Sequence, residues 1–332
     1  MTTPKLLLVS PVFHGYWETI KRSLEKLGYE VVPHLYDAPG NMNERIKNKL
    51  IHDLPERFRP VSAETSVTNQ VITAFHTARP DIVLTVKGDI LGAEWWDTLQ
   101  SSGVRYATWM YDELRRMRYT EQDYARLGAI ASYSPLDVQT LQGMGVEALE
   151  VPLAYDSDMP ISTQPSEAIT FVGARYAGRE EMLRGLAQQG IPVKAYGKQW
   201  SRHPWDIART RRWAHPGIPT GRDLDRSHAY GLMAASPATL NIHGDQDGFT
   251  MRTFEASGVG GLQIVDRPEV SRYYSPGEEV LVYESVAELV EICQRVLSDK
   301  AWAEKIRSAG FRRTQTEHTF NQRIRSLEQL WA

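Results

Sequence analysis

Continuous apolar runs alternate with amphipathic stretches along the chain, and this alternation constrains the fold more than any other feature of the sequence. In the first half, the apolar runs occupy residues 5–10, 81–86, 104–109, 128–132 and 148–153, and helical patterns follow residue 15 and cover 62–78, 121–127 and 135–142. Runs that are apolar at every position are typical of buried parallel strands. The first half is therefore predicted to be an α/β domain.

The pattern stops and then restarts. Residues 154–167 are rich in Pro, Ser and Asp and show no periodicity, so they are predicted to be a linker. Beyond them, strands are predicted at 168–173, 191–197, 238–243, 261–266 and 279–283, with helices near 178–189, 222–235, 250–258, 286–298 and 300–314. These series predict two doubly wound domains, 1–153 and 168–315, that face a cleft, with ligands at the carboxyl ends of the strands.

The composition of the chain excludes several classes of protein. The chain has 332 residues and a formal net charge of −3. The overall electrostatic field of the protein is therefore not one that attracts nucleic acid or an anionic membrane. Cys293 is the only cysteine, which excludes an internal disulfide and a cysteine-based zinc cluster and permits a reducing compartment. The apolar run near the N-terminus is too short for a signal peptide or a membrane span. We therefore expect a cytoplasmic protein.

The stretch DGFTMRTFEASGVGGLQIVD, residues 247–266, places two carboxylates around a helix start. Asp247 lies in the predicted loop, and Glu255 lies two turns inside the predicted helix, where it can accept hydrogen bonds from sugar hydroxyls. Backbone N–H groups at the helix start lack intrahelical acceptors, which favours an anion such as a diphosphate. The residues at this start are Gly248, Phe249 and Thr250. The alternative is structural: Asp247 caps the helix, and Glu255 pairs with Arg252.

The segment DGFTMRTFEASGVGG resembles the donor-binding signature of the retaining GT-B glycosyltransferases, in which Glu-Gly-Phe and, after seven intervening residues, a second Glu precede Ala-x-x-x-Gly. Residues 240–320 resemble the CgeB-like, spore-maturation type of glycosyltransferase more closely, through an Arg-x-Phe-Glu-Ala core, a Pro-Gly-Glu-Glu loop and a late His-Thr-aromatic element. FVGARYAGREEML and TWMYDE extend the resemblance loosely. The combination of these sequence elements is specific to the family, whereas no single element is.

The resemblance implies a GT-B fold, in which two Rossmann-like domains face a cleft and a C-terminal helix, here residues 316–332, crosses back to the first domain. It implies transfer of a sugar from a nucleotide-diphosphate donor to an acceptor hydroxyl or amine, on a small molecule or a polymer, with retention suggested by the signature. The nucleotide sugar is then a co-substrate, and no cofactor is expected. Metal independence is also expected, because no zinc-ligand spacing is present and the Asp-x-Asp at 156–158 lies in the linker.

Carried over position by position, the resemblance gives Glu255 the role of accepting hydrogen bonds from the nucleotide ribose. Asp247 takes the place of the Glu that touches the donor sugar ring, and this departure from Glu leaves the sugar open. Arg252 is a candidate for sharing the phosphate.

In FVGARYAGREEML, the resemblance places Gly173 at the cleft and implies that a basic pair, Arg175 and Arg179, neutralises the diphosphate. The alternative for Arg179 is a solvated charge on the helix face beside Glu180 or Glu181.

Further candidates follow other predicted strands. His14 and Gly15 lie in the first strand-to-helix loop, where Gly15 permits a close approach of the backbone to the ligand. Asp112 follows the strand at 104–109 and can bind or deprotonate an acceptor hydroxyl, and His243 ends the strand at 238–243. The alternatives are a loop histidine for His14 and a helix N-terminal acid for Asp112. No Gly-x-Gly-x-x-Gly supports a nicotinamide or flavin.

Residues 198–217 interleave arginines with tryptophans, so they are the one place where a nucleic-acid or phosphorylated acceptor is expected. The alternative is an ordinary loop in which arginine stems cover the tryptophans. Two rival functions also stay open for the whole chain: a nucleotide-sugar epimerase, which consumes donor without acceptor, and a non-catalytic nucleotide-sugar binding protein, which shows no turnover.

Overall fold

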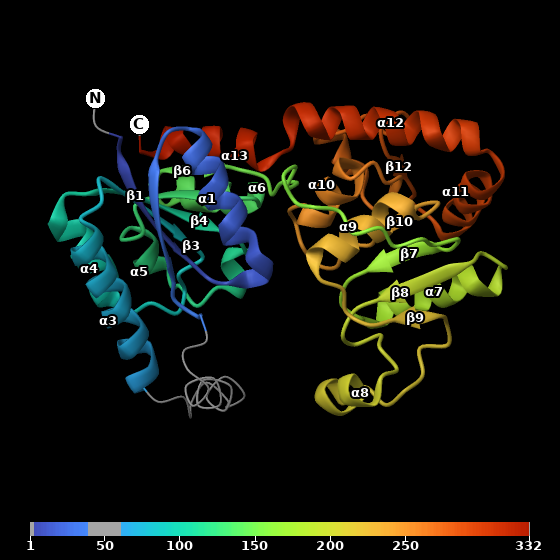
Figure 1. Cartoon of the computed structure of the whole chain (residues 1–332), viewed down its shortest axis with the longest axis horizontal. Coiled ribbons are helices and arrows are strands. Elements are labelled where there is room, and N and C mark those ends of the chain that lie inside the picture. The colour runs from blue at the N-terminus through green and yellow to red at the C-terminus, as the bar shows by residue number, and fades with distance from the viewer. Residues whose placement is uncertain (1–2, 39–60, 332) are drawn as a thin grey trace. The chain divides into compact units, whose positions relative to one another are not determined.

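The computed structural model describes residues 3–38 and 61–331, which form two compact units. Unit 1 comprises Met1–Pro152 and Phe320–Ala332, and unit 2 comprises Leu153–Thr319. Within the described residues, each unit contains one six-stranded sheet whose neighbouring strands all run parallel, with helices around it (Figure 1).

The sheet of unit 1 has the strand order β2-β1-β3-β4-β5-β6. The strands are β1 (Lys5–Ser10), β2 (Glu30–Leu35), β3 (Ile82–Val86), β4 (Arg105–Met110), β5 (Ala129–Ser132) and β6 (Ala148–Glu150). The helices before the C-terminal segment are η1 (Phe13–Gly15), α1 (Tyr16–Lys26), α3 (Val61–Ala78), α4 (Ala93–Ser102), η3 (Leu114–Arg116), α5 (Glu121–Tyr124) and α6 (Pro135–Gly143). Every residue of β3 is buried, which explains why its sequence is apolar throughout.

Helix α4 is absent from the sequence-based prediction. It begins after Gly92 and buries Trp95, Trp96 and Leu99 in the core of unit 1, where Trp95 meets Phe75 edge to face at 6.0 Å. Its apolar residues occupy little more than one turn, so the helical period of the sequence is weak there.

The sheet of unit 2 has the strand order β12-β11-β10-β7-β8-β9. The strands are β7 (Ile169–Val172), β8 (Val193–Tyr196), β9 (Thr220–Gly221), β10 (Thr239–Asn241), β11 (Gln263–Val265) and β12 (Leu281–Val282). The helices are α7 (Ala177–Gln188), α8 (Pro204–Thr210), α9 (Arg226–Ala235), α10 (Met251–Gly258), η4 (Pro268–Arg272), α11 (Val286–Ser298) and α12 (Lys300–Glu317). Strands β7 and β10 are neighbours although β8 and β9 separate them in the sequence, so the strand order reverses between them.

The segment predicted as a linker opens unit 2 and packs on α9. Asp156 is buried and pairs with Arg226 at 2.9 Å, and Ser162 hydrogen-bonds Ser227. Gly231 faces this segment so closely that a Cβ there would lie 1.7 Å from the Ser162 carbonyl oxygen. A glycine is therefore required on this face of α9.

The C-terminal helix α13 (Phe320–Leu327), with η5 (Glu328–Leu330), belongs to unit 1. Phe320 lies 6.1 Å from the Tyr16 ring of α1, and Tyr29 donates a hydrogen bond to Glu328. The predicted return of the C-terminal helix to the first domain is thereby confirmed. The helix starts later than residue 316, because α12 continues to Glu317 and His318 then bonds the Tyr273 carbonyl at 2.9 Å.

Across residues 3–38 and 61–331, the helices are either too short or too polar to cross a bilayer.

Candidate functional site

The strand reversal in unit 2 brings together residues that are far apart in the sequence. Ligands of doubly wound sheets bind at the carboxyl ends of the strands beside such a reversal. Gly173 directly follows β7, and His243 follows β10. Arg179 of α7 joins the two strand ends, since its Nε donates to the Ile242 carbonyl at 2.9 Å and its Nη1 to the Ala174 carbonyl at 3.2 Å. The structure therefore groups three predicted site residues at one place.

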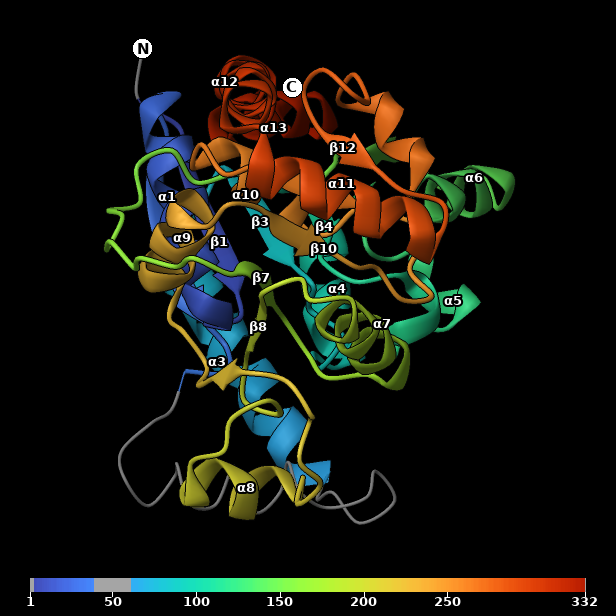
Figure 2. The same ribbon diagram turned by 90° about the vertical axis from the view of Figure 1, so that its right-hand side faces the viewer.

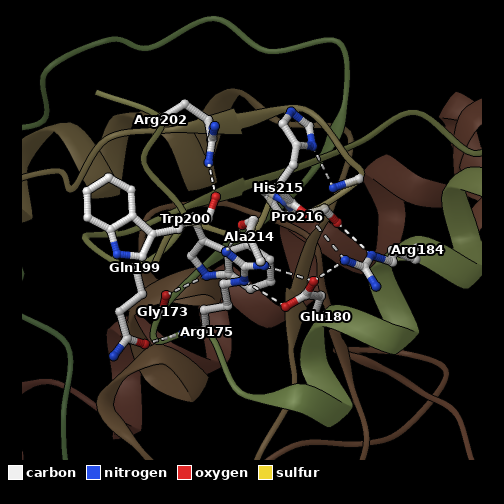
Figure 3. A network of polar contacts seen from close by, with 12 residues as sticks. Gly173, Arg175, Glu180, Arg184, Gln199, Trp200, Arg202, Ala214, His215 and Pro216 are labelled. Carbon is white, nitrogen blue, oxygen red and sulfur yellow. Dashed lines mark hydrogen bonds and ion pairs between the residues drawn. The ribbon is translucent and has the colours of Figure 1, made fainter. Parts of the chain in front are cut away.

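Arg175 makes its contacts with other residues than this group does. It is buried, donates two hydrogen bonds to Glu180 at 2.6 and 2.9 Å, and donates a third to the Ala214 carbonyl at 3.0 Å (Figure 3). The hydrogen bonds from Arg175 hold the pKa of Glu180 below its usual range. The guanidinium of Arg175 thus anchors residues near Ala214, which leaves Arg179 as the arginine of the predicted pair that lies at the strand reversal.

His243 is buried and held by Asp266. Its Nδ1 lies 2.7 Å from Asp266 Oδ1, its backbone N–H donates to Oδ2 at 2.8 Å, and its Nε2 lies 3.4 Å from Thr253 Oγ1 on α10. Asn241 donates to the same hydroxyl at 2.7 Å. Sequence reasoning missed Asp266, although it ends the strand predicted at 261–266, just as His243 ends the strand predicted at 238–243.

The loop between β10 and α10 is held by Arg267, another residue that the sequence analysis missed. Its guanidinium donates to the carbonyls of Gln246 at 2.7 Å, Asp247 at 2.6 Å and Gly248 at 3.2 Å, and it lies 4.6 Å over the Phe249 ring. Three carbonyls and an aromatic face on one side chain fix the loop backbone.

The start of α10 fits the anion site predicted from the sequence. Thr250 occupies the N-cap position without a side-chain cap hydrogen bond, and the first turn carries no acidic residue. Asp247 is therefore not the N-cap residue of this helix. The Thr253 N–H donates to the Thr250 carbonyl at 3.0 Å, whereas the N–H groups before it precede the intrahelical hydrogen bonds, and the helix dipole favours negative charge there.

Glu255 is fully buried inside α10. Its carboxylate accepts a hydrogen bond from the Tyr230 hydroxyl of α9 at 3.1 Å and forms an ion pair with Arg252, whose side chain is 34% exposed. The structural alternative for Glu255, an ion pair at i, i+3, is thus present in this structure. The carboxylate of Glu255 is therefore not exposed to a ligand in this structure.

The loop after β10 also contains an Asp-x-Asp, Asp245 and Asp247. The sequence analysis considered an Asp-x-Asp only at 156–158, in the predicted linker, and in this respect it is wrong. Among the residues that the structure describes, no three His, Cys, Asp or Glu side chains are grouped to hold a metal ion.

In unit 1, the predicted residues lie at two separate strands. His14 and Gly15 follow β1 with φ of 49° and 75°, a left-handed pair that starts α1. Asp112 follows β4 and lies 3.6 Å from the Nζ of Lys87, which follows β3 with φ of 62°. Lys87 was missed although it directly follows the strand predicted at 81–86, the kind of position that singled out Asp112. Strand β3 lies between β1 and β4, so the structure does not pair His14 with Asp112.

Replacing Arg267 by alanine is expected to loosen the 244–250 loop. The variant loses three charge-assisted hydrogen bonds, and a destabilisation of about 1–3 kcal/mol is expected. Hydrogen–deuterium exchange should rise across 244–250, whereas the exposed Arg272, changed to alanine, should leave that loop unaltered. Equal protection of the loop in both variants would show that the Arg267 contacts do not order it.

Comparison with known proteins agrees with this architecture. Residues 178–329 match the family described as "Glycosyl transferase-like". Among curated proteins, no sequence matches that of this chain.

Three solved structures illustrate the fold. Sucrose-phosphate synthase from Thermosynechococcus elongatus is 14% identical with a TM-score of 0.70, over 99% of this chain and 98% of that one. Anabaena HepE in complex with UDP-glucose is 11% identical with a TM-score of 0.62, over 98% and 100%. A putative UDP-N-acetylglucosamine 2-epimerase from Listeria monocytogenes is 11% identical with a TM-score of 0.59, over 99% and 95%.

These likenesses identify the fold as GT-B, as the sequence predicts. The family match at residues 178–329 covers most of unit 2 together with the C-terminal helix α13.

Proposed function

We propose that the protein transfers a sugar from a nucleoside-diphosphate donor to a hydroxyl or amine of an acceptor. The observation that carries the proposal is the strand reversal of unit 2, where Arg179 bridges the ends of β7 and β10 beside the uncapped start of α10. A cation and a row of backbone N–H groups at one strand reversal suit a diphosphate, whose charge grows as the glycosidic bond breaks.

The donor is held by an exchange of partners in α10. When the diphosphate binds, Arg252 turns from Glu255 to the phosphates, and the ribose hydroxyls take its place on the carboxylate. The Tyr230 hydroxyl, at 3.1 Å, keeps Glu255 oriented during the exchange. Asp247 contacts the donor sugar from a loop whose backbone Arg267 fixes. His243, oriented by Asp266, serves the reacting sugar.

Unit 1 supplies the acceptor side. The left-handed pair His14 and Gly15 permits a close approach of the backbone to an acceptor, and Asp112 binds or deprotonates the acceptor nucleophile. Lys87 Nζ, 3.6 Å from Asp112 Oδ2, places a positive charge beside that carboxylate.

The finer assignment rests on the sequence. The Arg-x-Phe-Glu-Ala core supports a CgeB-like enzyme, and the donor-binding signature supports retention of the anomeric configuration. The proposed enzyme requires no cofactor, because the nucleotide sugar is a co-substrate, and it works in the cytoplasm. Metal independence is kept in the proposal and tested directly, because Asp245 and Asp247 form an Asp-x-Asp.

A screen of thermal stability tests the donor site. We expect one of UDP, GDP, dTDP and ADP, or its sugar conjugate, to stabilise the protein, by about 2.7 kcal/mol at 100 times its Kd. The stabilisation should persist in EDTA and should not increase with Mg²⁺ or Mn²⁺. If no nucleotide stabilises the folded protein, the proposal fails; if a nucleotide does so only with a metal, metal independence fails.

The epimerase is the second candidate, supported by the GT-B neighbour that is described as a putative UDP-N-acetylglucosamine 2-epimerase. The two functions separate in one measurement. A transferase releases nucleoside diphosphate and glycosylated acceptor in equal amounts, whereas an epimerase converts the sugar nucleotide with no acceptor present.

A further inference from the structure

Residues 199–217, between β8 and β9, form a surface that the proposed glycosyl transfer does not use. This segment contains α8, which projects away from β9, the edge strand of the sheet of unit 2 (Figure 1), and α8 is also seen apart from the sheet in Figure 2. Trp205 is 66% exposed and Trp213 is 72% exposed, the two most exposed of the large apolar side chains described. Indoles this exposed contribute little to the fold.

The charge of the segment is opposite to that of the chain. It contains four arginines and one acid, Asp206, which gives a net charge of +3, whereas the whole chain carries −3. Asp206 is buried and bonded to Ser201 and Arg222 at 2.7 and 2.9 Å, so it does not neutralise the exposed arginines. These are Arg202, Arg209, Arg211 and Arg212.

The backbone that carries this surface is held in place. Arg184 donates to the carbonyls of Pro216 at 2.7 Å and His215 at 3.3 Å, and Arg175 donates to that of Ala214 (Figure 3). Arg202 donates to the Trp213 carbonyl at 3.1 Å. The contacts around Arg175 and Arg184 thus present Trp213 without covering its ring.

The arginines do not cover the indoles either. In the described part of the chain, no guanidinium stacks on Trp205 or Trp213, and no ion pair involves Arg209, Arg211 or Arg212. The tryptophan of the segment that meets a guanidinium is the buried Trp200, under Arg175 at 5.6 Å, and not either of the two exposed indoles.

We propose that residues 199–217 bind single-stranded nucleic acid, with Trp205 and Trp213 stacking on bases and the exposed arginines on phosphates. Unpaired bases offer aromatic faces beside regularly spaced phosphates, which matches aromatic and cationic groups interleaved at one surface. A neutral glycan fits less well, because the exposed side chains of 199–217 include no carboxylate to accept from its hydroxyls. A membrane fits less well, because α8 has two turns and buries Ile207, its aliphatic residue.

Fluorescence anisotropy with a labelled oligothymidylate of about 20 nucleotides, longer than the ~4–16 that such surfaces cover, tests the proposal. The protein should bind it more tightly than a duplex of equal length. Trp205→Ala with Trp213→Ala should weaken binding about tenfold or more. Arg209→Gln, Arg211→Gln and Arg212→Gln together should reduce the slope of log K against log salt by about 2.

The matched control changes an exposed aromatic–arginine pair on α12, Phe311→Ala with Arg312→Gln, and should leave binding unchanged. The proposal is overturned if the oligonucleotide does not bind, if the control variant weakens binding equally, or if the duplex binds as tightly. It is also overturned if only phosphatidylglycerol–phosphatidylcholine vesicles bind, which would make the surface a lipid-docking site. Donor binding should be unaltered in all variants, so either proposal can fail without the other.

Discussion

Changing Asp156 to alanine is expected to destabilise unit 2 by about 3–5 kcal/mol, because it leaves a buried guanidinium without its carboxylate. Asp156 Oδ2 lies 2.9 Å from Arg226 Nη2, and the two side chains are 1% and 5% exposed. For a unit of this size, the loss corresponds to a fall in Tm of roughly 6–20 °C. Calorimetry of the purified variant measures it.

Two further variants test whether the loss of stability comes from breaking the buried ion pair or from any change in this segment. Asp158, two residues on and exposed, should change stability by no more than about 0.5 kcal/mol when replaced by alanine. Asp156→Leu with Arg226→Met should recover much of the loss, since paired apolar residues need no counter-charge. An equal loss in the single and double variants would mean that packing, not the ion pair, stabilises this contact.

Much of the fold follows from local sequence patterns. The parallel strands of both sheets are apolar because both faces are covered, so β1, β3 and β7 are visible as continuous runs. The C-terminal helix is visible through its amphipathic period. By contrast, the apolar residues of α4 occupy little more than one turn, and α8 has only seven residues, so neither helix shows a clear period. Strand β9 has two residues, whose pairing with β8 depends on the sheet itself.

The candidate site divides in the same way. Glu255, the start of α10 and His243 were found because each stands at a recognisable place in a βα unit. Their partners were not: Tyr230 comes from α9, and Arg267 reaches back about twenty residues to the loop carbonyls. Such contacts are set by tertiary packing, which a local pattern does not encode.

Arg175 and Arg179 illustrate the limit sharply. The two arginines lie in one short motif, and the resemblance implies the same role for both, which is to neutralise the diphosphate. In the structure, Arg175 pairs with Glu180, five residues on. Arg179 instead donates to the carbonyl of Ile242, which directly follows β10, the neighbour of β7 at the reversal. The two arginines have different partners because a different stretch of backbone lies beside each of them.

The partner exchange in α10 predicts different losses for two single variants. Glu255→Gln should weaken binding of both the nucleoside and its diphosphate by about 10–100-fold, the effect of losing a charged hydrogen-bond acceptor. The glutamine still accepts from the Tyr230 hydroxyl, so the fold should be kept. Arg252→Gln should weaken the diphosphate alone, and the nucleoside should bind as tightly or more tightly, because Glu255 no longer has a competing partner.

Isothermal titration with the nucleotide chosen by the thermal screen, and with its nucleoside, measures both effects. Glu278→Gln, a change at an exposed acid of the same unit, is the matched control and should alter neither affinity. Unchanged nucleoside binding in folded Glu255→Gln would make the Arg252–Glu255 pair a structural contact of α10. Equal loss of nucleoside and diphosphate in Arg252→Gln would show that Arg252 shapes the pocket instead of neutralising phosphate, because a charge that acts on phosphate has no effect on a ligand without one.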